Sequence, residues 1–246
     1  MDSIPPRKNL CLRTGYHAKM LIRILTWLRS SGPTWQYRRI WLDALIVTIC
    51  LNVLAWLIFA KMGMPTSEIF AEDGPIEDLQ SLSLAITALL GIVAASRTRI
   101  LARFVATAIT CISVVFFARE MPICRGSVTV YCVSKTWLPI IIGAAVLILL
   151  IATIVFEYRH RGGLSRAIHP RLSWPLGFVA AVLGLSQLAE SLDIVVIEES
   201  LESYGFMILT LSAAWLFRFA RSQQVEPLRK RAKASLSRFK HAISNH

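Results

Sequence analysis

Carboxylates are the residues of this chain whose types and spacing could do chemistry. The chain has 15 acidic residues, and eleven of them gather in a few short stretches beside long apolar runs. Clustered carboxylates can hold a hard divalent cation such as Mg²⁺ or Ca²⁺ through oxygen ligands, and crowded like charges favour proton uptake and relay. The eleven residues are Glu68, Glu72, Asp73, Glu77, Asp78, Glu120, Glu190, Asp193, Glu198, Glu199 and Glu202.

A candidate site combines these acids with the polar and basic side chains nearest to them. Arg119 is the basic residue that directly abuts an apolar run beside the acids, and it is the natural partner of Glu120. Spacings of three or four residues put side chains on one face of a helix, as for Glu77 with Gln80. The candidate set is Glu77, Gln80, Arg119, Glu120, Glu190, Asp193, Glu198, Glu199 and Glu202.

Histidine is missing from these acidic stretches, which narrows the chemistry. All five histidines lie in or beside basic stretches elsewhere in the chain. Their placement disfavours a zinc hydrolase built on histidine and carboxylate, and it leaves no Ser-His-Asp triad among the acids. The chain also lacks the GxxxxGK[ST], GxGxxG and HExxH motifs.

Two of the five cysteines, Cys124 and Cys132, are predicted to form a disulfide. They are separated by residues 125–131, which include Gly126 and a β-prone run. This spacing suits a short hairpin closed by a disulfide, a bond that persists in an oxidising periplasm. Metal binding is the weaker interpretation, because two cysteines without a nearby histidine cannot complete a tetrahedral zinc site.

Six apolar segments must position the candidate residues. Of the 246 residues, 55% are apolar and 17% are charged, and the mean hydropathy is +0.56. This composition excludes a disordered chain and an ordinary soluble domain. Because a helix needs about 20 mostly apolar residues to cross a bilayer, the sequence predicts an all-α polytopic membrane helix bundle with about six transmembrane helices. They are expected at 40–60, 76–96, 100–118, 137–156, 174–196 and 200–220.

The basic residues predict which side of the membrane each segment faces. Of the 27 lysines and arginines, 23 lie in or near the two terminal segments or the connections between the second and third spans and between the fourth and fifth. These segments are all expected on one side of the membrane, and only Lys61, Arg119, Arg125 and Lys135 fall on the other side. Since cytoplasmic loops retain positive charge, we expect a bacterial inner-membrane protein with both termini in the cytoplasm. The candidate site and the disulfide then face the periplasm. The formal net charge of +12 follows from this topology, and no nucleic-acid partner is expected.

Three domains follow from the same pattern. Residues 1–39 are expected to form a basic cytoplasmic segment with an interfacial helix, 40–220 the six-helix transmembrane domain, and 221–246 a basic amphipathic cytoplasmic tail. In both terminal segments apolar residues recur at helical spacing among basic ones. Anionic lipids at the cytoplasmic face would attract them by about 1 kcal/mol per basic residue. The alternative is a solvated basic tail that only enforces topology.

The helix dipole accounts for only some of the eleven clustered acids. Acids at the N-terminal ends of the second and sixth spans are electrostatically favoured, whereas Glu120, Glu190 and Asp193 follow C-terminal ends and need another partner, for which Arg119 is the candidate. Charged groups at membrane depth usually face the bundle interior or water. We therefore expect a polar pocket open to the periplasm between the second, third, fifth and sixth spans. The alternative is that the acids lie hydrated in the headgroup layer, with Arg119 in an ordinary ion pair.

Three short motifs resemble those of a group of uncharacterised bacterial multi-pass inner-membrane proteins. That group carries an acidic-Gly-x-x-Glu entry, an Arg-Glu pair and a late Glu-Glu-x-x-Glu in this order. The resemblance covers about residues 70–215, and it implies that the pocket residues act as a set without implying an activity. The motifs here are Glu72-Asp73-Gly74-Pro75-Ile76-Glu77 followed by Gln80, Ala118-Arg119-Glu120-Met121, and Glu198-Glu199-Ser200-Leu201-Glu202.

Three functions stay open at this point. The simplest is a binding or accessory envelope protein that uses the acidic pocket, with a protein partner or a second copy of the chain. A second is a metal-dependent hydrolase or transferase acting on lipid headgroups, with Glu77, Glu120, Glu190 or Asp193 as acid, base or metal ligand. A third is a cation- or proton-coupled transporter, which the scarcity of ionisable groups in the span middles disfavours. No cofactor is evident beyond the divalent cation that the acids suggest.

Overall fold

The computed structural model describes residues 22, 26–27, 39–71, 74–122, 124 and 132–244. Helices make up nearly all of these ranges, and no strand occurs in them, which confirms the all-α fold. The helices are α2 (Ile40–Lys61), α3 (Thr66–Ile69), α4 (Pro75–Arg97), α5 (Ile100–Glu120), α6 (Trp137–Arg159), α7 (Gly163–Ala167), α8 (Pro170–Glu190) and α9 (Val195–Ser244).

Some expectations fall outside the described residues. The interfacial helix expected within residues 1–39 is one of them, apart from residues 22, 26 and 27, which are helical. The acids Glu72 and Asp73 and the loop 125–131 are others. The apolar stripe expected along the C-terminal tail also lies there, because side chains are described only as far as Ser222.

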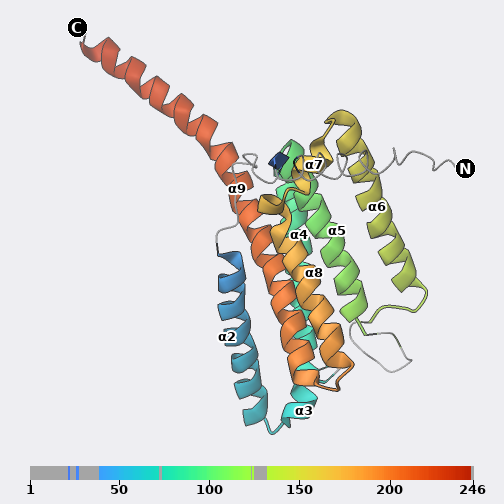
Figure 1. Ribbon diagram of the computed structural model, residues 1–246. Helices are drawn as coiled ribbons and strands as arrows, with labels where there is room; N and C mark the ends of the chain where they lie inside the picture. Colours follow the sequence, from blue (N-terminus) through green and yellow to red (C-terminus); the bar gives the residue numbers. More distant parts are fainter. Residues whose placement is uncertain are drawn as a thin grey trace, which may run out of the picture.

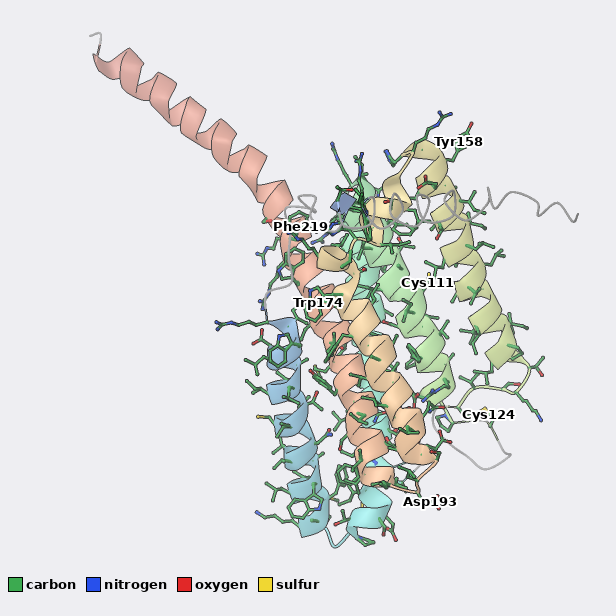
Figure 2. The ribbon with its side chains drawn as sticks, in the orientation of Figure 1. Cys111, Cys124, Tyr158, Trp174, Asp193 and Phe219 are labelled. Atoms are coloured by element: carbon green, nitrogen blue, oxygen red, sulfur yellow. A yellow bond between two sulfur atoms is a disulfide. The ribbon has the colours of Figure 1, made fainter. Side chains whose placement is uncertain are left out.

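Six of the helices are long and apolar enough to cross a membrane: α2, α4, α5, α6, α8 and the part of α9 from Val195 to Ser222. They fit a multi-pass membrane protein. They run alternately up and down the bundle (Figure 1), so that α3 lies at one end and α7 at the other. We call these the α3 end and the α7 end. Figure 2 shows Cys124 and Asp193 at the α3 end and Tyr158 at the α7 end.

The centre of the bundle is built around α9. This helix packs against α4, α8 and α2, and α4 packs in turn against α5. Fully buried side chains on α9, among them Phe206, Leu209 and Leu216, form the middle of the core together with Leu84 of α4 and Ile109 of α5. Figure 1 shows α2 and α6 at opposite edges of the bundle. The core therefore lies between α4, α5, α8 and α9.

The entry into α4 depends on a close approach of backbone. Gly74 is the N-cap residue, and Pro75 follows at the start of the helix, where its missing N–H costs no hydrogen bond. A Cβ at Gly74 would lie 2.6 Å from the carbonyl oxygen of Ala71 and 2.8 Å from that of Glu68. Only glycine fits there, so it brings α3 directly against the start of α4.

Two helices differ from the segments that hydropathy predicts. The fifth apolar segment was expected at 174–196, but α8 begins at Pro170, after the N-cap His169, and ends at Glu190. Asp193 then adopts a left-handed conformation with φ of 55°, which makes the turn into α9. Aspartate tolerates this conformation better than most residues. The last helix does not end near residue 220, because α9 continues through Ser244 and projects beyond the bundle at the α7 end (Figure 1).

The predicted disulfide between Cys124 and Cys132 is present, with their Cα atoms 5.1 Å apart. The flanking backbone pairs on both sides of it. The amide of Cys124 donates to the carbonyl oxygen of Val133 at 3.1 Å, and the amide of Val133 donates to that of Pro122 at 2.8 Å. The disulfide thus joins the C-terminal end of α5 to the approach to α6.

Candidate functional site

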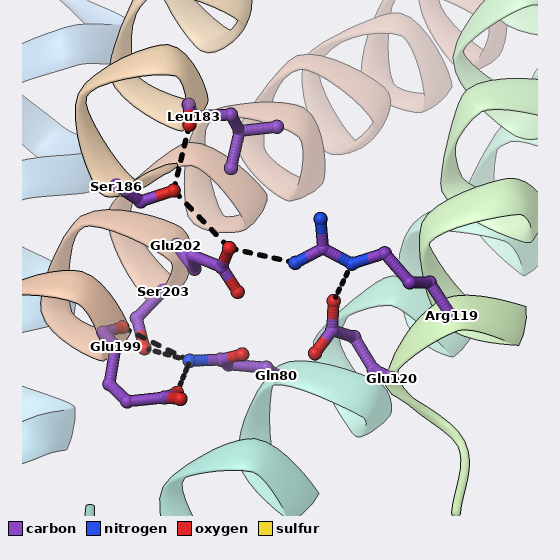
Figure 3. Close-up of polar contacts among 8 residues, drawn as sticks. All are labelled: Gln80, Arg119, Glu120, Leu183, Ser186, Glu199, Glu202 and Ser203. Atoms are coloured by element: carbon purple, nitrogen blue, oxygen red, sulfur yellow. Dashed lines mark hydrogen bonds and ion pairs between the residues drawn. The ribbon is translucent and has the colours of Figure 1, made fainter. Parts of the chain in front are cut away.

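A polar cluster lies inside the bundle at its α3 end. Four helices contribute to it, and each places a polar residue at a position that continues its own buried stripe. On α4, for example, the buried stripe runs through Ile76, Gln80 and Leu84, as expected for a helix face that meets its neighbours every three or four residues. Figure 3 shows the members of what we call the polar cluster: Gln80, Arg119, Glu120, Ser186, Glu199, Glu202 and Ser203.

Arg119 joins two acids that come from different helices. Its Nε donates to Oε1 of Glu120 at 2.9 Å, and its Nη2 donates to Oε1 of Glu202 at 2.7 Å. The guanidinium also lies over the ring of Phe116, 6.0 Å from the centroid. Both carboxylates are almost buried, whereas 47% of the arginine side chain is exposed. The Arg119–Glu202 ion pair therefore holds α5 to α9 at the edge of the core.

Gln80 joins α4 to α9 and is only 2% exposed. Its Nε2 donates to the backbone carbonyl of Glu199 at 3.0 Å, to Oε2 of Glu199 at 2.8 Å and to the hydroxyl of Ser203 at 3.0 Å. The backbone carbonyl of Glu199 can only accept a hydrogen bond, and so can its carboxylate while it is ionised. The amide nitrogen of Gln80, and not its oxygen, must therefore face them. The amide oxygen then has no partner among the described residues, and Figure 3 shows it on the side of Glu120.

Ser186 brings α8 into the cluster. Its hydroxyl lies 3.2 Å from Oε1 of Glu202 and 2.8 Å from the carbonyl oxygen of Leu183. Because the serine has one O–H hydrogen, Glu202 accepts from Arg119 and shares the donor of Ser186 with the carbonyl oxygen of Leu183. A carboxylate held by several donors is positioned firmly, because each additional charge-assisted bond restricts its rotamer.

The cluster carries more acid than base. Glu120, Glu199 and Glu202 are each at most 7% exposed, and among the residues that the structure describes Arg119 is the only cation in an ion pair with any of them. Glu77, one turn before Gln80 on α4, lies near enough to act electrostatically on Glu120 and Glu199. Burying unpaired charge is costly, so this excess of carboxylates calls for a cation or for protons.

Four further candidate residues, Glu77, Glu190, Asp193 and Glu198, lie near the α3 end of the bundle. Glu198 is half-buried at the start of α9. Glu190 and Asp193 are exposed at the turn between α8 and α9, and neither forms a side-chain hydrogen bond or ion pair with a described residue. Arg119 therefore meets Glu120, as expected, but pairs with Glu202 in place of Glu190 and Asp193. Asp193 has a different explanation in its left-handed backbone conformation.

Two serines of the polar cluster, Ser186 and Ser203, were not among the candidate residues. Helical spacing could have found both, since Ser186 precedes Glu190 by one turn and Ser203 follows Glu199 by one turn. Serine is common on membrane helices as a small packing residue, so its type alone carries little signal. Only the pairing of the helices reveals that these hydroxyls meet a carboxylate and an amide.

The arrangement can bind a group that is positively charged and donates hydrogen bonds. The unpartnered oxygen of Gln80 and the excess carboxylates all accept, while the guanidinium of Arg119 can receive an anion on its exposed side. In the described residues, no group of three or more histidine, cysteine, aspartate or glutamate side chains is arranged to hold a metal ion. The geometry therefore suits the acids and Gln80 to binding a cation, and Arg119 to binding an anion.

Comparisons with known proteins add no assignment to this geometry. No protein-family model matches the chain, and neither a curated protein nor a solved structure matches it.

Proposed function

We propose that this chain is a binding protein of the bacterial inner membrane whose polar cluster takes up a primary ammonium group from the periplasmic side. The observation that carries the proposal is the oxygen of Gln80, which is buried beside three carboxylates and receives no hydrogen bond from any described residue. A buried acceptor without a donor costs about 1–3 kcal/mol. A ligand that supplies an N–H donor would remove that cost.

Charge supports the same ligand. With Glu120, Glu199 and Glu202 ionised, Arg119 leaves an excess of negative charge in a nearly buried place. An ammonium group would offset part of it and has three N–H donors to share. It would therefore satisfy both the electrostatic and the hydrogen-bonding deficit of the cluster.

The distribution of basic residues supports the side from which the ligand arrives. The described basic residues at the α7 end include Arg97, Arg159, Arg166 and Arg218, whereas Lys61, Arg119 and Lys135 are those at the α3 end. Since positive charge is retained in the cytoplasm, the α7 end would face the cytoplasm and the α3 end the periplasm. The disulfide at the α3 end agrees with an oxidising compartment.

Thermal unfolding of the full chain, purified in a neutral detergent, tests the proposal. Ethanolamine is the probe, and choline is the matched control because it carries the same charge on a quaternary nitrogen without N–H donors. We expect ethanolamine to stabilise the protein saturably, by about 2.7 kcal/mol at 100 times its dissociation constant. Choline is expected to have little effect.

Two matched variants separate the cluster from the surrounding acids. Glu199→Gln should abolish the ethanolamine effect, whereas Glu190→Gln, which removes an exposed acid at the same end, should preserve it. Equal stabilisation by choline, or an ethanolamine effect that survives Glu199→Gln, would contradict the proposal. Stabilisation by Mg²⁺ or Ca²⁺ alone would replace the ammonium site with a metal site.

A further inference from the structure

An apolar groove leads along the bundle to the polar cluster. It has a volume of about 340 Å³, and every residue that lines it is apolar, which puts it in the range of about 300–1,000 Å³ found for ligand pockets. The groove exists because α6 packs against α5 and α7 but not appreciably against α8 or α9. Its lining residues are Cys111, Ile112, Val115, Phe116, Ala145, Val146, Leu149, Leu176, Val179, Ala180, Leu183 and Leu209.

The groove and the polar cluster meet one helical turn apart. On α5 the last lining residue is Phe116, and Arg119 follows after three residues; on α8 the last is Leu183, and Ser186 follows after three. At a rise of 1.5 Å per residue this step is about 4.5 Å. The hydroxyl of Ser186 bonds the carbonyl oxygen of Leu183 itself. The apolar groove therefore ends directly at the polar cluster.

Arg119 stands at this junction with one nitrogen free. Its Nε and Nη2 are engaged by Glu120 and Glu202, while Nη1 forms no hydrogen bond with a described residue. Figure 3 shows the free nitrogen on the side of Leu183, which lines the groove. The guanidinium also rests on Phe116, another lining residue. An anionic group at the end of the groove would meet this nitrogen first.

From this sequence of surfaces we infer that the ligand is a phospholipid with a primary amine headgroup, one acyl chain of which occupies the groove. The phosphate would bind Nη1 of Arg119, and the ammonium group would reach the oxygen of Gln80 and the carboxylates of Glu120 and Glu199. The inference rests on the proposed ammonium site and adds the ligand class. Apolar chain, anion and cation follow one another in the lipid in the order in which the protein offers their partners.

Lipid binding to the full chain in neutral detergent tests this assignment. The probes are dioleoyl phosphatidylethanolamine, the choline and glycerol analogues with the same acyl chains, and soluble phosphoethanolamine, which has the headgroup without chains. Native mass spectrometry gives the dissociation constant of each lipid. We expect the ethanolamine lipid to bind at least about tenfold more tightly than either analogue, which corresponds to about 1.4 kcal/mol in binding free energy.

Two substitutions on α8 form a matched pair. Ala180 lines the groove and is exposed, and its neighbour Ala181 is exposed but does not line it. Ala180→Trp should fill the groove and weaken binding of the ethanolamine lipid about tenfold, while Ala181→Trp should leave it unchanged. Both positions have room for the indole, so a folding defect in one variant alone is not expected.

The outcomes separate this inference from the proposed function. One result is that soluble phosphoethanolamine stabilises the protein but the ethanolamine lipid binds no more tightly than this soluble headgroup. Another is that Ala180→Trp leaves binding of the ethanolamine lipid intact. In either case the groove is not part of the site, and the ammonium site stands alone. If all three lipids bind alike and insensitively to Ala180→Trp, only surrounding bilayer lipid is being measured and the inference fails. If neither ethanolamine nor its lipid acts, the ammonium site itself is wrong.

Discussion

The contact between α4 and α9 and the contact between α5 and α6 are held together by different means. Polar side chains cross the first: Gln80 bonds Glu199 and Ser203, and the hydroxyl of Thr87 lies 2.7 Å from that of Thr210. Across the second, the described residues form no side-chain hydrogen bond. The rings of Phe104 and Phe156 stack across it, with centroids 4.5 Å apart.

The difference matters because lipid is as apolar as the side chains themselves. Leaving lipid for a neighbouring helix brings little hydrophobic gain, so close packing and polar bonds decide which helices hold together. In the apolar window of α9 half of the residues are buried within the protein, against 6% for α6. The α4–α9 contact is therefore the firmly held part of the bundle, and we call it the frame. The groove lies beside α6, which is packed more loosely.

The largest effect should come from removing the cation of the polar cluster. Arg119→Met keeps most of the apolar stem but leaves Glu120 and Glu202 without their ion pair. Breaking a buried pair on one side costs about 3–5 kcal/mol, and because 47% of Arg119 is exposed we expect the lower end, about 3 kcal/mol. Reversible unfolding by SDS in mixed micelles measures this loss. Lys61→Met, at an exposed position of the same end, should change stability little; equal losses would mean that the cluster is hydrated.

Gln80→Leu should have the next largest effect. It removes a donor that is shared by Glu199 and Ser203 and leaves a buried carboxylate unsatisfied, which costs about 2 kcal/mol. The same unfolding assay should show no comparable loss for Gln187→Leu, since Gln187 is exposed near the end of α8. A neutral Gln80→Leu would show that the amide contributes nothing to the α4–α9 contact.

Hydropathy was sufficient to predict the fold class. Apolar runs of about 20 residues located six helices, and the first four agree with the structure to within a few residues at each end. The fifth differs because capping and turn geometry, at His169 and Asp193, decide where a helix starts and stops. Hydropathy averages over a window and does not register these local signals.

The candidate site was only partly predictable, because its members come from four helices. Acid and base types identified Arg119, Glu120, Glu199 and Glu202 as candidates, and spacing from Glu77 identified Gln80. Spacing within one helix does not tell which neighbour each helix meets. Whether a residue near a helix end is buried, as Glu202 is, or exposed, as Glu190 is, depends on that tertiary pairing. The groove leaves no signal in the sequence, because it results from a missing contact between helices.

A pair of glycines compares the two sides of the bundle directly. A Cβ at Gly91 of α4 would collide with the hydroxyl of Thr110 on α5 and lie 3.3 Å from the carbonyl oxygen of Ala106, whereas a Cβ at Gly143 of α6 meets nothing within 4 Å. Alanine is about 1 kcal/mol better than glycine in a helix, and overpacking costs about 1–3 kcal/mol. Gly91→Ala should therefore lose about 1 kcal/mol, while Gly143→Ala should be neutral or stabilising. If the two alanine variants have the same stability, α4 and α6 are equally loose.

The smallest effect should come from the hydroxyl pair in the middle of the bundle. Thr87→Val removes the bond to Thr210 and also the bond from Thr87 to the carbonyl oxygen of Ser83 in its own helix. Interhelical hydrogen bonds in membrane proteins average about 0.6 kcal/mol. Thr153→Val on α6 is the control, since the hydroxyl of Thr153 bonds the carbonyl oxygen of Leu149 in the same helix and no side chain that the structure describes on another helix.

The difference between Thr87→Val and Thr153→Val therefore isolates the bond that crosses from α4 to α9. An excess loss of about 0.6 kcal/mol for Thr87→Val in the SDS unfolding assay would show that polar bonds hold the frame along its length. Equal losses would confine the polar contribution to the α3 end. In that case small residues and tight packing would join α4 to α9 between the polar cluster and the α7 end, like the close approach of α4 to α5 at Gly91.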